Sequence, residues 1–293
     1  MNILLTGGSG FIGKNILESY LVKKYNIIAP SHSELDLIDN ENVKSFFLSH
    51  KIDVVIHSAC KPGHRNAKDP TNIFYTNSRM FFNLLKNSSF FEKMIVLGSG
   101  AVYDMRYDIH KVKEGYFDTH MPQDEHGFQK YVSTKVIEHL DNVVELNIFS
   151  IFGKYEDYAI RFISNAICKT IFDLPITIKQ NRKFDFFYVD DLIPVLEYFI
   201  ENKWQYPTYN VTPDKSIELY ELAEKIKKIS GKDLPVLIGQ PGKGLEYSGD
   251  NTRLRNEIKD LKLTSMDESI TKLYRWYSEN IHLINKDFLL FDK

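Results

Sequence analysis

The sequence predicts an α/β fold, in which a doubly wound parallel sheet carries a smaller C-terminal α/β lobe. Three observations favour this fold class. Short apolar segments alternate with helical patterns through the first two-thirds of the 293-residue chain. The first apolar segment, Asn2–Leu5, runs directly into a glycine-rich turn, as the first strand of such sheets does. After about residue 204 the alternation gives way to a more mixed pattern, which indicates a second lobe.

Each candidate strand of the sheet is short and apolar, as expected for strands that are buried on both faces. In chain order the candidates are Asn2–Leu5, Asn26–Ala29, Val54–His57, Met94–Leu97, Val143–Phe149 and Phe186–Val189. Helical patterns lie between them, for example from Ile73 to Leu85, where apolar residues recur on one face.

The smaller lobe is expected to contain two strands, Thr208–Val211 and Leu234–Ile238, and a helix from Ser216 to Ile229. Two later helical patterns follow. The predicted domains are residues 1–155 with 183–204 for the sheet, and 156–182 with 205–293 for the smaller lobe.

The turn after the first strand, Thr6-Gly7-Gly8-Ser9-Gly10-Phe11-Ile12-Gly13, has the glycine spacing of a dinucleotide-binding loop. In this spacing Gly7 permits the tight turn, Gly10 leaves room for the phosphates, and Gly13 lets the helix pack closely on the strand. The helix that follows presents free amides and a partial positive charge to the phosphates. The expected cofactor contacts are Gly7, Gly10, Phe11, Ile12 and Gly13.

Two other interpretations of these glycines stay open. Gly8 to Asn15 reads G-x-x-x-x-G-K-N, which is a P-loop except for its last residue. A P-loop needs Ser or Thr at that position to ligate magnesium, and Asn15 has no hydroxyl, so this interpretation is disfavoured. A chance glycine turn without a ligand is the second alternative.

The composition is that of a globular protein, and it excludes several classes of function. Apolar residues make up 43% and charged residues 26%, and a net charge of −2 argues against nucleic acid as a partner. No apolar run approaches the ~18 residues of a membrane span, and no signal peptide precedes the first strand. We therefore expect a cytoplasmic protein with no membrane partner. Cys60 and Cys168 are too few for a disulfide framework or a thiolate metal site, and no metal is expected.

Tyr131 and Lys135 carry the strongest chemical signal. They stand four residues apart in a helical stretch, so their side chains are expected on one face. A lysine ammonium beside a phenol lowers the tyrosine pKa, which makes the phenol a usable acid and base. Tyr20 and Lys24 repeat the spacing without any catalytic context. Ser99, which follows a predicted strand, is expected to reach the same pocket and to hold the same substrate oxygen.

Taken together, the motifs resemble those of the extended short-chain dehydrogenase/reductase family, whose members act on nucleotide-activated sugars. The matching motifs are Thr6–Gly13, Ser99-Gly100-Ala101-Val102-Tyr103, Tyr131-x-x-x-Lys135, Phe187-Tyr188-Val189-Asp190-Asp191-Leu192, Tyr209-Asn210-Val211, Asp250-Asn251-Thr252-Arg253 and Trp276-Tyr277. They occur in the family's order and cover essentially the whole chain. The resemblance implies a Rossmann-type domain, with Tyr131 as the proton donor, Lys135 also bound to the nicotinamide ribose, and Ser99 orienting the reacting oxygen. It also implies a homodimer.

The resemblance implies a nicotinamide cofactor, and the end of the second strand bears on its identity. NAD-selective members carry an acidic residue there, which binds the adenosine ribose. This strand ends Ala29-Pro30-Ser31-His32, without a carboxylate, so NADP(H) is favoured over NAD(H). Ser31 and His32 are expected to bind the 2′-phosphate. The remaining expected cofactor contacts are Asp36, Leu37 and Ala59.

Within the family, the chain is most similar to GDP-fucose synthases and related 4-keto-6-deoxy sugar reductases. Dehydratases place Asp-Glu where this chain has Gly100 and Ala101, so dehydration is disfavoured. GDP-fucose synthases carry a cysteine at the position of Ala101, which puts epimerisation beside the ketone in doubt. The prediction is an NAD(P)-dependent reductase of a nucleotide-activated 4-keto-6-deoxy sugar. The alternative is a nucleotide-sugar 4-epimerase that keeps NAD bound, and a non-enzymatic cofactor-sensing module is disfavoured because the Tyr–Lys pair is present.

Substrate contacts are expected from loops that follow the strands and from the smaller lobe. They are Asn77, Ser99, Gly100, Ala101, Ser150 and Arg253, with His64, Arg65 and His126 as further candidates for the sugar pocket. Arg253 is the favoured partner of the substrate diphosphate, because its Asp-Asn-Thr-Arg context resembles the family's phosphate-binding arginine. Ser150 and Phe184 stand where the family often has asparagine and arginine, so the nucleotide and the sugar stay unassigned.

Overall fold

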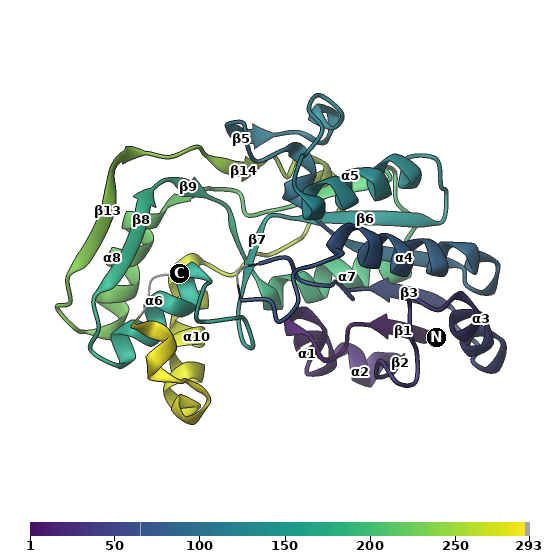
Figure 1. The fold of residues 1–293 in the computed structure, drawn as a ribbon, viewed down its shortest axis with the longest axis horizontal. Helices are drawn as coiled ribbons and strands as arrows, with labels where there is room; N and C mark the ends of the chain where they lie inside the picture. The colour runs from purple at the N-terminus through teal and green to yellow at the C-terminus, as the bar shows by residue number, and fades with distance from the viewer. Residues whose placement is uncertain (65, 291–293) are drawn as a thin grey trace.

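A six-stranded parallel sheet forms the larger lobe of the computed structural model, which describes residues 1–64 and 66–290 (Figure 1). Its strand order is β11-β6-β4-β3-β1-β2. The first strand therefore has the second on one side and the third on the other, and the direction of winding reverses there. Ligands of such sheets bind at this point, beyond the carboxyl ends of the strands. The strands are β1 Asn2–Thr6, β2 Asn26–Ile28, β3 Val54–His57, β4 Lys93–Ser99, β6 Val143–Ile148 and β11 Thr208–Val211.

Helices cover both faces of this sheet, because successive side chains of a strand point to opposite sides. The covering helices are α1 Phe11–Leu17, α2 Leu21–Lys24, α3 Asn40–Ser49, α4 Ile73–Lys86, α5 Glu125–Ile137 and α7 Leu192–Glu201. On one face Ile3 and Leu5 of β1 share a core with α1, α2 and α7. On the other face Leu4 shares a core with α3, α4 and α5. Every residue of β3 is buried, which explains why Val54, Val55 and Ile56 form a continuous apolar run.

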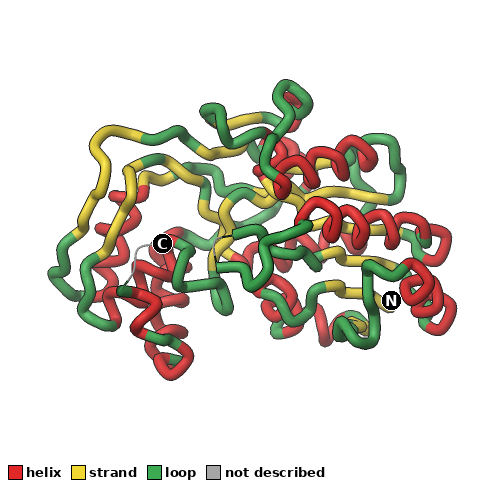
Figure 2. Tube along the Cα trace, in the orientation of Figure 1, coloured by secondary structure: helices red, strands yellow, loops and turns green. Residues whose placement is uncertain are grey.

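The smaller lobe has an apolar core of its own, formed by α6, α8, α10 and the parallel strand pair β8–β13. Figure 2 shows these helices gathered on one side of the two long strands. Two shorter sheets, β10-β7 and β12-β9-β14-β5, lie toward the larger lobe. The elements are β5 Ile109–Val112, β7 Ser150–Phe152, α6 Phe162–Ile171, β8 Ile176–Asn181, β9 Lys183–Phe184, β10 Phe186–Tyr188, β12 Ile217–Glu218, α8 Leu219–Ser230, β13 Val236–Lys243, β14 Tyr247–Gly249, α9 Thr252–Glu257 and α10 Met266–Glu279. Short 3-10 turns cover Ser88–Phe90, Gly100–Tyr103, Glu114–Tyr116, Val189–Asp191, Ile281–Leu283 and Lys286–Leu289.

The predicted fold class is confirmed, but two predicted strands exchange places. Phe186–Val189, expected in the large sheet, forms β10 and pairs with β7 instead. Thr208–Val211, expected in the smaller lobe, is β11, whose four buried residues pair in parallel with β6. The reason is the crossover helix α7, which packs on the large sheet and returns the chain to its free edge beside β6. The other five strands predicted for the large sheet form β1, β2, β3, β4 and β6, and Leu234–Ile238, predicted for the smaller lobe, overlaps β13.

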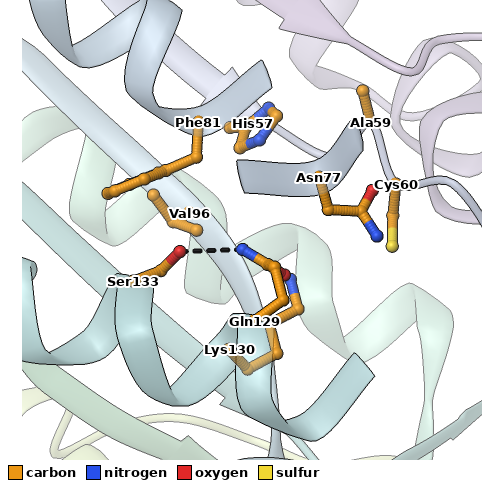
Figure 3. A pocket seen from close by; sticks show the side chains of 9 residues that line it. All are labelled: His57, Ala59, Cys60, Asn77, Phe81, Val96, Gln129, Lys130 and Ser133. Carbon is orange, nitrogen blue, oxygen red and sulfur yellow. Dashed lines mark hydrogen bonds between the residues drawn. The ribbon is translucent and has the colours of Figure 1, made fainter. Parts of the chain in front are cut away.

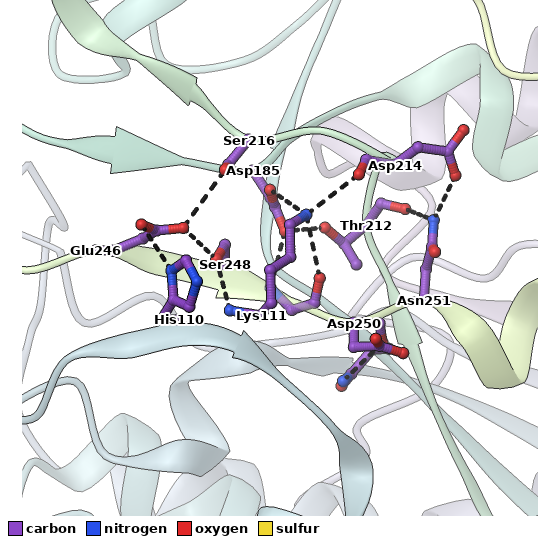
Figure 4. A network of polar contacts seen from close by, with 12 residues as sticks. His110, Lys111, Asp185, Thr212, Asp214, Ser216, Glu246, Ser248, Asp250 and Asn251 are labelled. Carbon is purple, nitrogen blue, oxygen red and sulfur yellow. Dashed lines mark hydrogen bonds and ion pairs between the residues drawn. The ribbon is translucent and has the colours of Figure 1, made fainter.

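A buried polar network ties the sheet that contains β5 and β14 to the end of β11 (Figure 4). Asp185 is fully buried and accepts hydrogen bonds from the Gly249 amide, at 2.8 Å, and from the Thr212 hydroxyl. The Lys111 ammonium of β5 lies 3.4 Å from the same carboxylate. Lys111 also donates to the carbonyl oxygens of Asp214 and Gly249. One carboxylate therefore holds β5, β14 and the segment after β11 together.

Candidate active site

The glycine loop after β1 has the shape that a pyrophosphate requires. Gly7 has φ +72°, and a Cβ there would lie 2.7 Å from the Ala59 amide nitrogen. A Cβ on Gly13 would lie 2.2 Å from the Gly7 carbonyl oxygen, so glycine is needed for α1 to begin this close to the strand. A Cβ on Gly10 would meet only the Gly7 carbonyl oxygen, at 3.2 Å, among the described atoms within 4 Å. The space beside Gly10 is therefore open to a phosphate, and the loop fits a dinucleotide.

The loop after β2 contains a carboxylate close to the predicted ribose site. Glu34 accepts hydrogen bonds from the Ser31 amide, at 2.7 Å, and from the Ser31 hydroxyl, at 2.8 Å. These two bonds lower the pKa of Glu34, which keeps it ionised at neutral pH. His32 is exposed, and its Nδ1 lies 3.9 Å from the Asp36 carboxylate. The strand end Ala29–His32 itself has no carboxylate, as predicted, but the turn that follows brings the Glu34 carboxylate onto Ser31.

Beyond the glycine loop a cavity of about 660 Å³, here called the central cavity, opens toward the smaller lobe. Its lining includes Phe11 of α1, Ser99 at the end of β4, and Ser150 of β7. His126 of α5 and Arg161, at the start of α6, also line it. Ligand pockets commonly have about 300–1,000 Å³, so the central cavity has the size of a substrate site.

Ser99 is positioned at the central cavity by its neighbours. Its hydroxyl accepts a hydrogen bond from the Ala101 amide, at 3.1 Å, and is hydrogen-bonded to the Tyr247 hydroxyl of β14. Burial raises the pKa of Tyr247, so this hydroxyl stays protonated at neutral pH. A Cβ on Gly100 would lie 2.5 Å from the Tyr247 hydroxyl oxygen, which explains the glycine after Ser99. The predicted Ser99 is thus joined at the cavity by a tyrosine from the smaller lobe.

The structure places Tyr131 and Lys135 away from the central cavity. Both bind one carboxylate: the Tyr131 hydroxyl donates to Asp118 Oδ1, and the Lys135 ammonium lies 2.6 Å from Asp118 Oδ2. The Tyr131 ring packs against Phe117, with the ring centroids 5.2 Å apart. Neither residue is among the described residues that line the cavity. The hydrogen bond to Asp118 raises the pKa of Tyr131, which is opposite to the lowering that the Tyr–Lys spacing predicts.

A second pair with the same spacing lies on another face of α5. His126 lines the central cavity, and Lys130 lines a small cavity of about 10 Å³ together with Ala59 and Asn77 (Figure 3). The Lys130 side chain is buried, with 8% of the residue exposed, and donates to a carbonyl oxygen of β4 at 3.2 Å. Cys60 lines both cavities, so the two cavities adjoin.

The predicted substrate contacts divide between the cavity and other parts of the molecule. Ala101 and Ser150 line the central cavity, and so does His64, whereas Arg65 lies outside the described residues. Arg253 does not line it.

Arg253 instead packs against side chains of the larger lobe. Its guanidinium lies over the Tyr206 ring, 4.4 Å from the centroid, and 3.5 Å from the buried Glu114 carboxylate. Among the described residues that line the central cavity, the arginine is Arg161. The structure therefore does not bring the favoured diphosphate partner to the cavity, because α9 packs its arginine beside the far edge of the sheet.

On the cofactor side, Asn77 positions the loop after β3. Its Oδ1 accepts a hydrogen bond from the Lys61 amide at 2.7 Å, and its side chain lines the small cavity rather than the central one. Ala59, next to Gly7, lines the same small cavity. Ile12 packs into the core beneath α1, and Leu37 is buried with the core beside α3.

The sequence-based prediction missed three residues of the site, Glu34, Lys130 and Tyr247, and it also missed Asp118, which binds Tyr131 and Lys135 outside the cavity. Lys130 had a signal, because it follows His126 at the same spacing of four as the Tyr–Lys pair. The positions of Glu34, Asp118 and Tyr247 depend on turns and on the smaller lobe, which produce no periodic pattern in the sequence.

The described part of the chain contains no group of three or more His, Cys, Asp or Glu side chains that could hold a metal ion. None of the helices in residues 1–64 and 66–290 combines the length and the hydropathy that a bilayer crossing requires.

The parallel sheet, the glycine loop and the adjoining cavity define a Rossmann-type, dinucleotide-binding protein. The model of the NAD dependent epimerase/dehydratase family matches residues 3–212, and the chain belongs to this family of NAD(P)-dependent enzymes. The predicted family is thereby confirmed.

Similar proteins include both reductases and epimerases. GDP-L-colitose synthase from Yersinia pseudotuberculosis is 26% identical over 254 residues, covering 79% of this chain and 82% of that protein. The structure of MlghC, a GDP-mannoheptose C4 reductase from Campylobacter jejuni with NADP bound, has a TM-score of 0.81 at 20% identity, covering 94% of this chain and 98% of that one. UDP-glucose 4-epimerase from Thermotoga maritima also has a TM-score of 0.81 at 20% identity, covering 96% and 100%.

Proposed function

We propose that the protein is an NADP(H)-dependent reductase of a nucleotide-activated 4-keto-6-deoxy sugar. The observation that carries the proposal is the central cavity, in which Phe11 of the glycine loop and Ser99 line the same space. A dinucleotide at the loop and a ketone at Ser99 would share this space. The name of one similar protein, GDP-mannoheptose C4 reductase, supports reduction at C4, and the name of another, GDP-L-colitose synthase, supports a nucleotide sugar.

The cofactor would be held by the glycine loop, with its adenosine ribose at the loop that contains Ser31. When bound, the nicotinamide supplies the hydride that reduces the ketone. The protein's own part is to hold the ketone oxygen and to give it a proton. Ser99 and Tyr247 present hydroxyls to that oxygen, and the proton comes from α5, where two pairs carry the required spacing.

Arg161 would bind the diphosphate of the substrate. Among the described residues that line the central cavity, Arg161 is the one whose side chain carries a permanent positive charge. A guanidinium suits this role, because its donors match phosphate oxygens in a bidentate arrangement.

The test is to identify the nucleotide that the purified protein releases on denaturation, and then to assay it with NADPH on 4-keto-6-deoxyhexoses linked to GDP, UDP, CDP or dTDP. The expected result is little retained NAD, tighter binding of NADPH than of NADH, and oxidation of NADPH with at least one of these sugars. A protein that binds neither dinucleotide would exclude the proposal.

A nucleotide-sugar 4-epimerase is the second candidate, and Glu34 is the observation that favours it. A carboxylate beside the adenosine ribose suits the 2′-hydroxyl of NAD better than a 2′-phosphate. Near-stoichiometric release of NAD, with interconversion of two nucleotide sugars and no net oxidation, would establish this activity instead.

Glu34→Gln is expected to shift cofactor preference toward NADPH by about tenfold, because it removes a negative charge close to the 2′-phosphate. The measurement is the ratio of the Kd values for NADPH and NADH. Glu41→Gln, which removes a carboxylate from the exposed first turn of α3, is the matched control. We also expect His32→Ala to weaken NADPH more than NADH. Equal ratios of the two Kd values in the Glu34 and Glu41 variants would show that Glu34 does not contact the cofactor.

The homodimer implied by the resemblance is also proposed here. Light scattering on the purified protein at micromolar concentration would test it, and a monomeric mass would contradict it.

A further inference from the structure

We propose that His126 and Lys130 are the pair on α5 that acts on the substrate and the cofactor, in place of Tyr131 and Lys135. His126 gives the proton to the substrate oxygen at Ser99, and Lys130 binds the ribose of the nicotinamide half of the cofactor. The assignment rests on the proposed function, since it names the groups that act in that reduction.

The geometry of α5 separates the two pairs. Residues four apart on an α-helix lie about 40° apart around its axis, and residues five apart lie about 140° apart. His126 and Lys130 therefore share one face, and Tyr131 and Lys135 share another. The first face opens on the two cavities, and the second meets Asp118. Of these four residues, His126 alone lines the central cavity, which Ser99 also lines, and Lys130 lines the small cavity that adjoins it.

His126 is available to a ligand. Among the described residues, neither nitrogen of its ring has a hydrogen-bond partner, although the side chain lines the same cavity as Ser99. Its charged neighbours are Lys130, on the next turn of α5, Asp124, at the start of that helix, and Arg161, at the start of α6. Burial and the positive charge of Lys130 lower the pKa of His126 to about 4.

Proton transfer from a protonated imidazole to the developing alkoxide is favourable, because the alkoxide is by far the stronger base. As the C4 carbon accepts hydride, the C=O π electrons move to the oxygen. The imidazolium N–H bond breaks and an O–H bond forms on that oxygen, which leaves a neutral imidazole. The neutral ring is the form that the surroundings of His126 favour, and it is reprotonated from solvent. The negative diphosphate of a bound substrate, near Arg161, would raise the protonated fraction.

Lys130 has spare donors in a buried place. An ammonium has three N–H groups, and the structure shows one of them used, on the Leu97 carbonyl oxygen at 3.2 Å. No carboxylate of the described residues lies within 4.0 Å of it. The buried Glu145 of β6 interacts with the Lys130 charge but makes no ion pair with it, and a buried cation with spare donors is costly unless a ligand supplies the missing contacts. Ribose hydroxyls are suitable acceptors, and a ribose in the central cavity would approach Lys130 where that cavity adjoins the small one, at Cys60.

Lys135 has no such capacity. Its ammonium is bound to Asp118 at 2.6 Å and lies 4.0 Å from Glu138, and 39% of its side chain is exposed. Its charge is therefore already compensated at the surface.

The first test is cofactor binding, which needs no substrate. Lys130→Met is expected to weaken NADPH about 10- to 100-fold, measured by fluorescence titration, because charge-assisted hydrogen bonds are lost. Lys135→Met, the matched control on the same helix, should change the Kd by less than about twofold. If Lys130→Met does not fold, Lys130→Gln and Lys130→Arg provide the comparison. Equal affinity in the Lys130 and Lys135 variants, or loss in Lys135→Met alone, would overturn the assignment of Lys130.

The second test is turnover of the sugar that the wild-type protein reduces. His126→Gln should lower kcat about 100-fold or more while NADPH binding stays unchanged, because it removes the acid and keeps a polar side chain. Tyr131→Phe should keep near-normal kcat. His126→Tyr places a phenol one turn before Lys130, and it should recover activity over His126→Gln with a shifted pH profile. Loss of turnover in Tyr131→Phe with activity retained in His126→Gln would overturn the proposal.

Failure of the proposed function is distinguishable from failure of this assignment. If the wild-type protein binds NADPH but reduces none of the sugars, the proposed function fails. The binding comparison of Lys130→Met with Lys135→Met still supports or overturns the cofactor half. The role of His126 is then tested in the epimerase assay with the same variants. The kcat of His126→Gln is again expected to be far below that of Tyr131→Phe.

Discussion

Gly10→Ala is expected to fold and to lose about 10- to 100-fold in affinity for NADPH. Gly10 has φ −77° and ψ 177°, a backbone conformation that alanine adopts freely. The added Cβ would contact only the Gly7 carbonyl oxygen in the protein, at 3.2 Å. It would stand, however, in the space that the phosphates need. An added methyl at a packed contact costs about 1–3 kcal/mol, which corresponds to this loss of affinity.

The measurement is a dinucleotide titration together with a melting curve. Loss of glycine at the N-cap of α1 costs about 1 kcal/mol, so a small decrease of a few degrees in melting temperature is expected. Gly115→Ala is the control, since a Cβ there has no described atom within 4 Å. Binding by Gly10→Ala within about twofold of wild type would mean that the pyrophosphate lies elsewhere.

Asp185→Ala is expected to destabilise the protein by about 3–5 kcal/mol, the usual cost of removing one partner from a buried charged network. The change leaves the Thr212 hydroxyl and the Gly249 amide without their acceptor, and it leaves Lys111 facing a cavity. A decrease of roughly 10 °C in melting temperature follows for a chain of this size. Because the network joins β5 and β14 to the segment after β11, Tyr247 of β14 should also lose its fixed place beside Ser99.

Asp185→Asn is the matched variant, because its amide oxygen can still accept from both neighbours while the charge on Lys111 is unpaired. We expect it to lose about half as much stability, measured by thermal or urea unfolding. A loss below about 1 kcal/mol in Asp185→Ala would show that water replaces the carboxylate without cost.

How far the sequence predicts this protein depends on the range of the interactions involved. The apolar runs predicted five of the six strands of the large sheet, because burial on both faces leaves a mark on each residue of a strand. The glycine loop was also predictable from the sequence, since steric contacts within or next to the first βα unit require glycine at Gly7 and Gly13. Ser99 followed from its place at the end of β4.

The predictions that failed depended on contacts between distant segments. Which strand joins the edge of the sheet was decided by the packing of α7, and both Phe186–Val189 and Thr208–Val211 are short apolar runs that fit either place. The Glu34 carboxylate contacts Ser31 through a turn of the chain. The residues at the strand end do not reveal such a contact, because Glu34 follows them in the sequence.

The sequence by itself determined the fold class, the family and the dinucleotide loop, because these rest on local periodicity and on steric needs of neighbouring residues. Only the tertiary structure decided that His126 and Lys130, rather than Tyr131 and Lys135, line the two adjoining cavities. Spacing on a helix says which side chains are neighbours, and it does not say toward which part of the molecule they point. That direction is set by the packing of α5 against the sheet and by Asp118, which binds the outward pair from a separate loop.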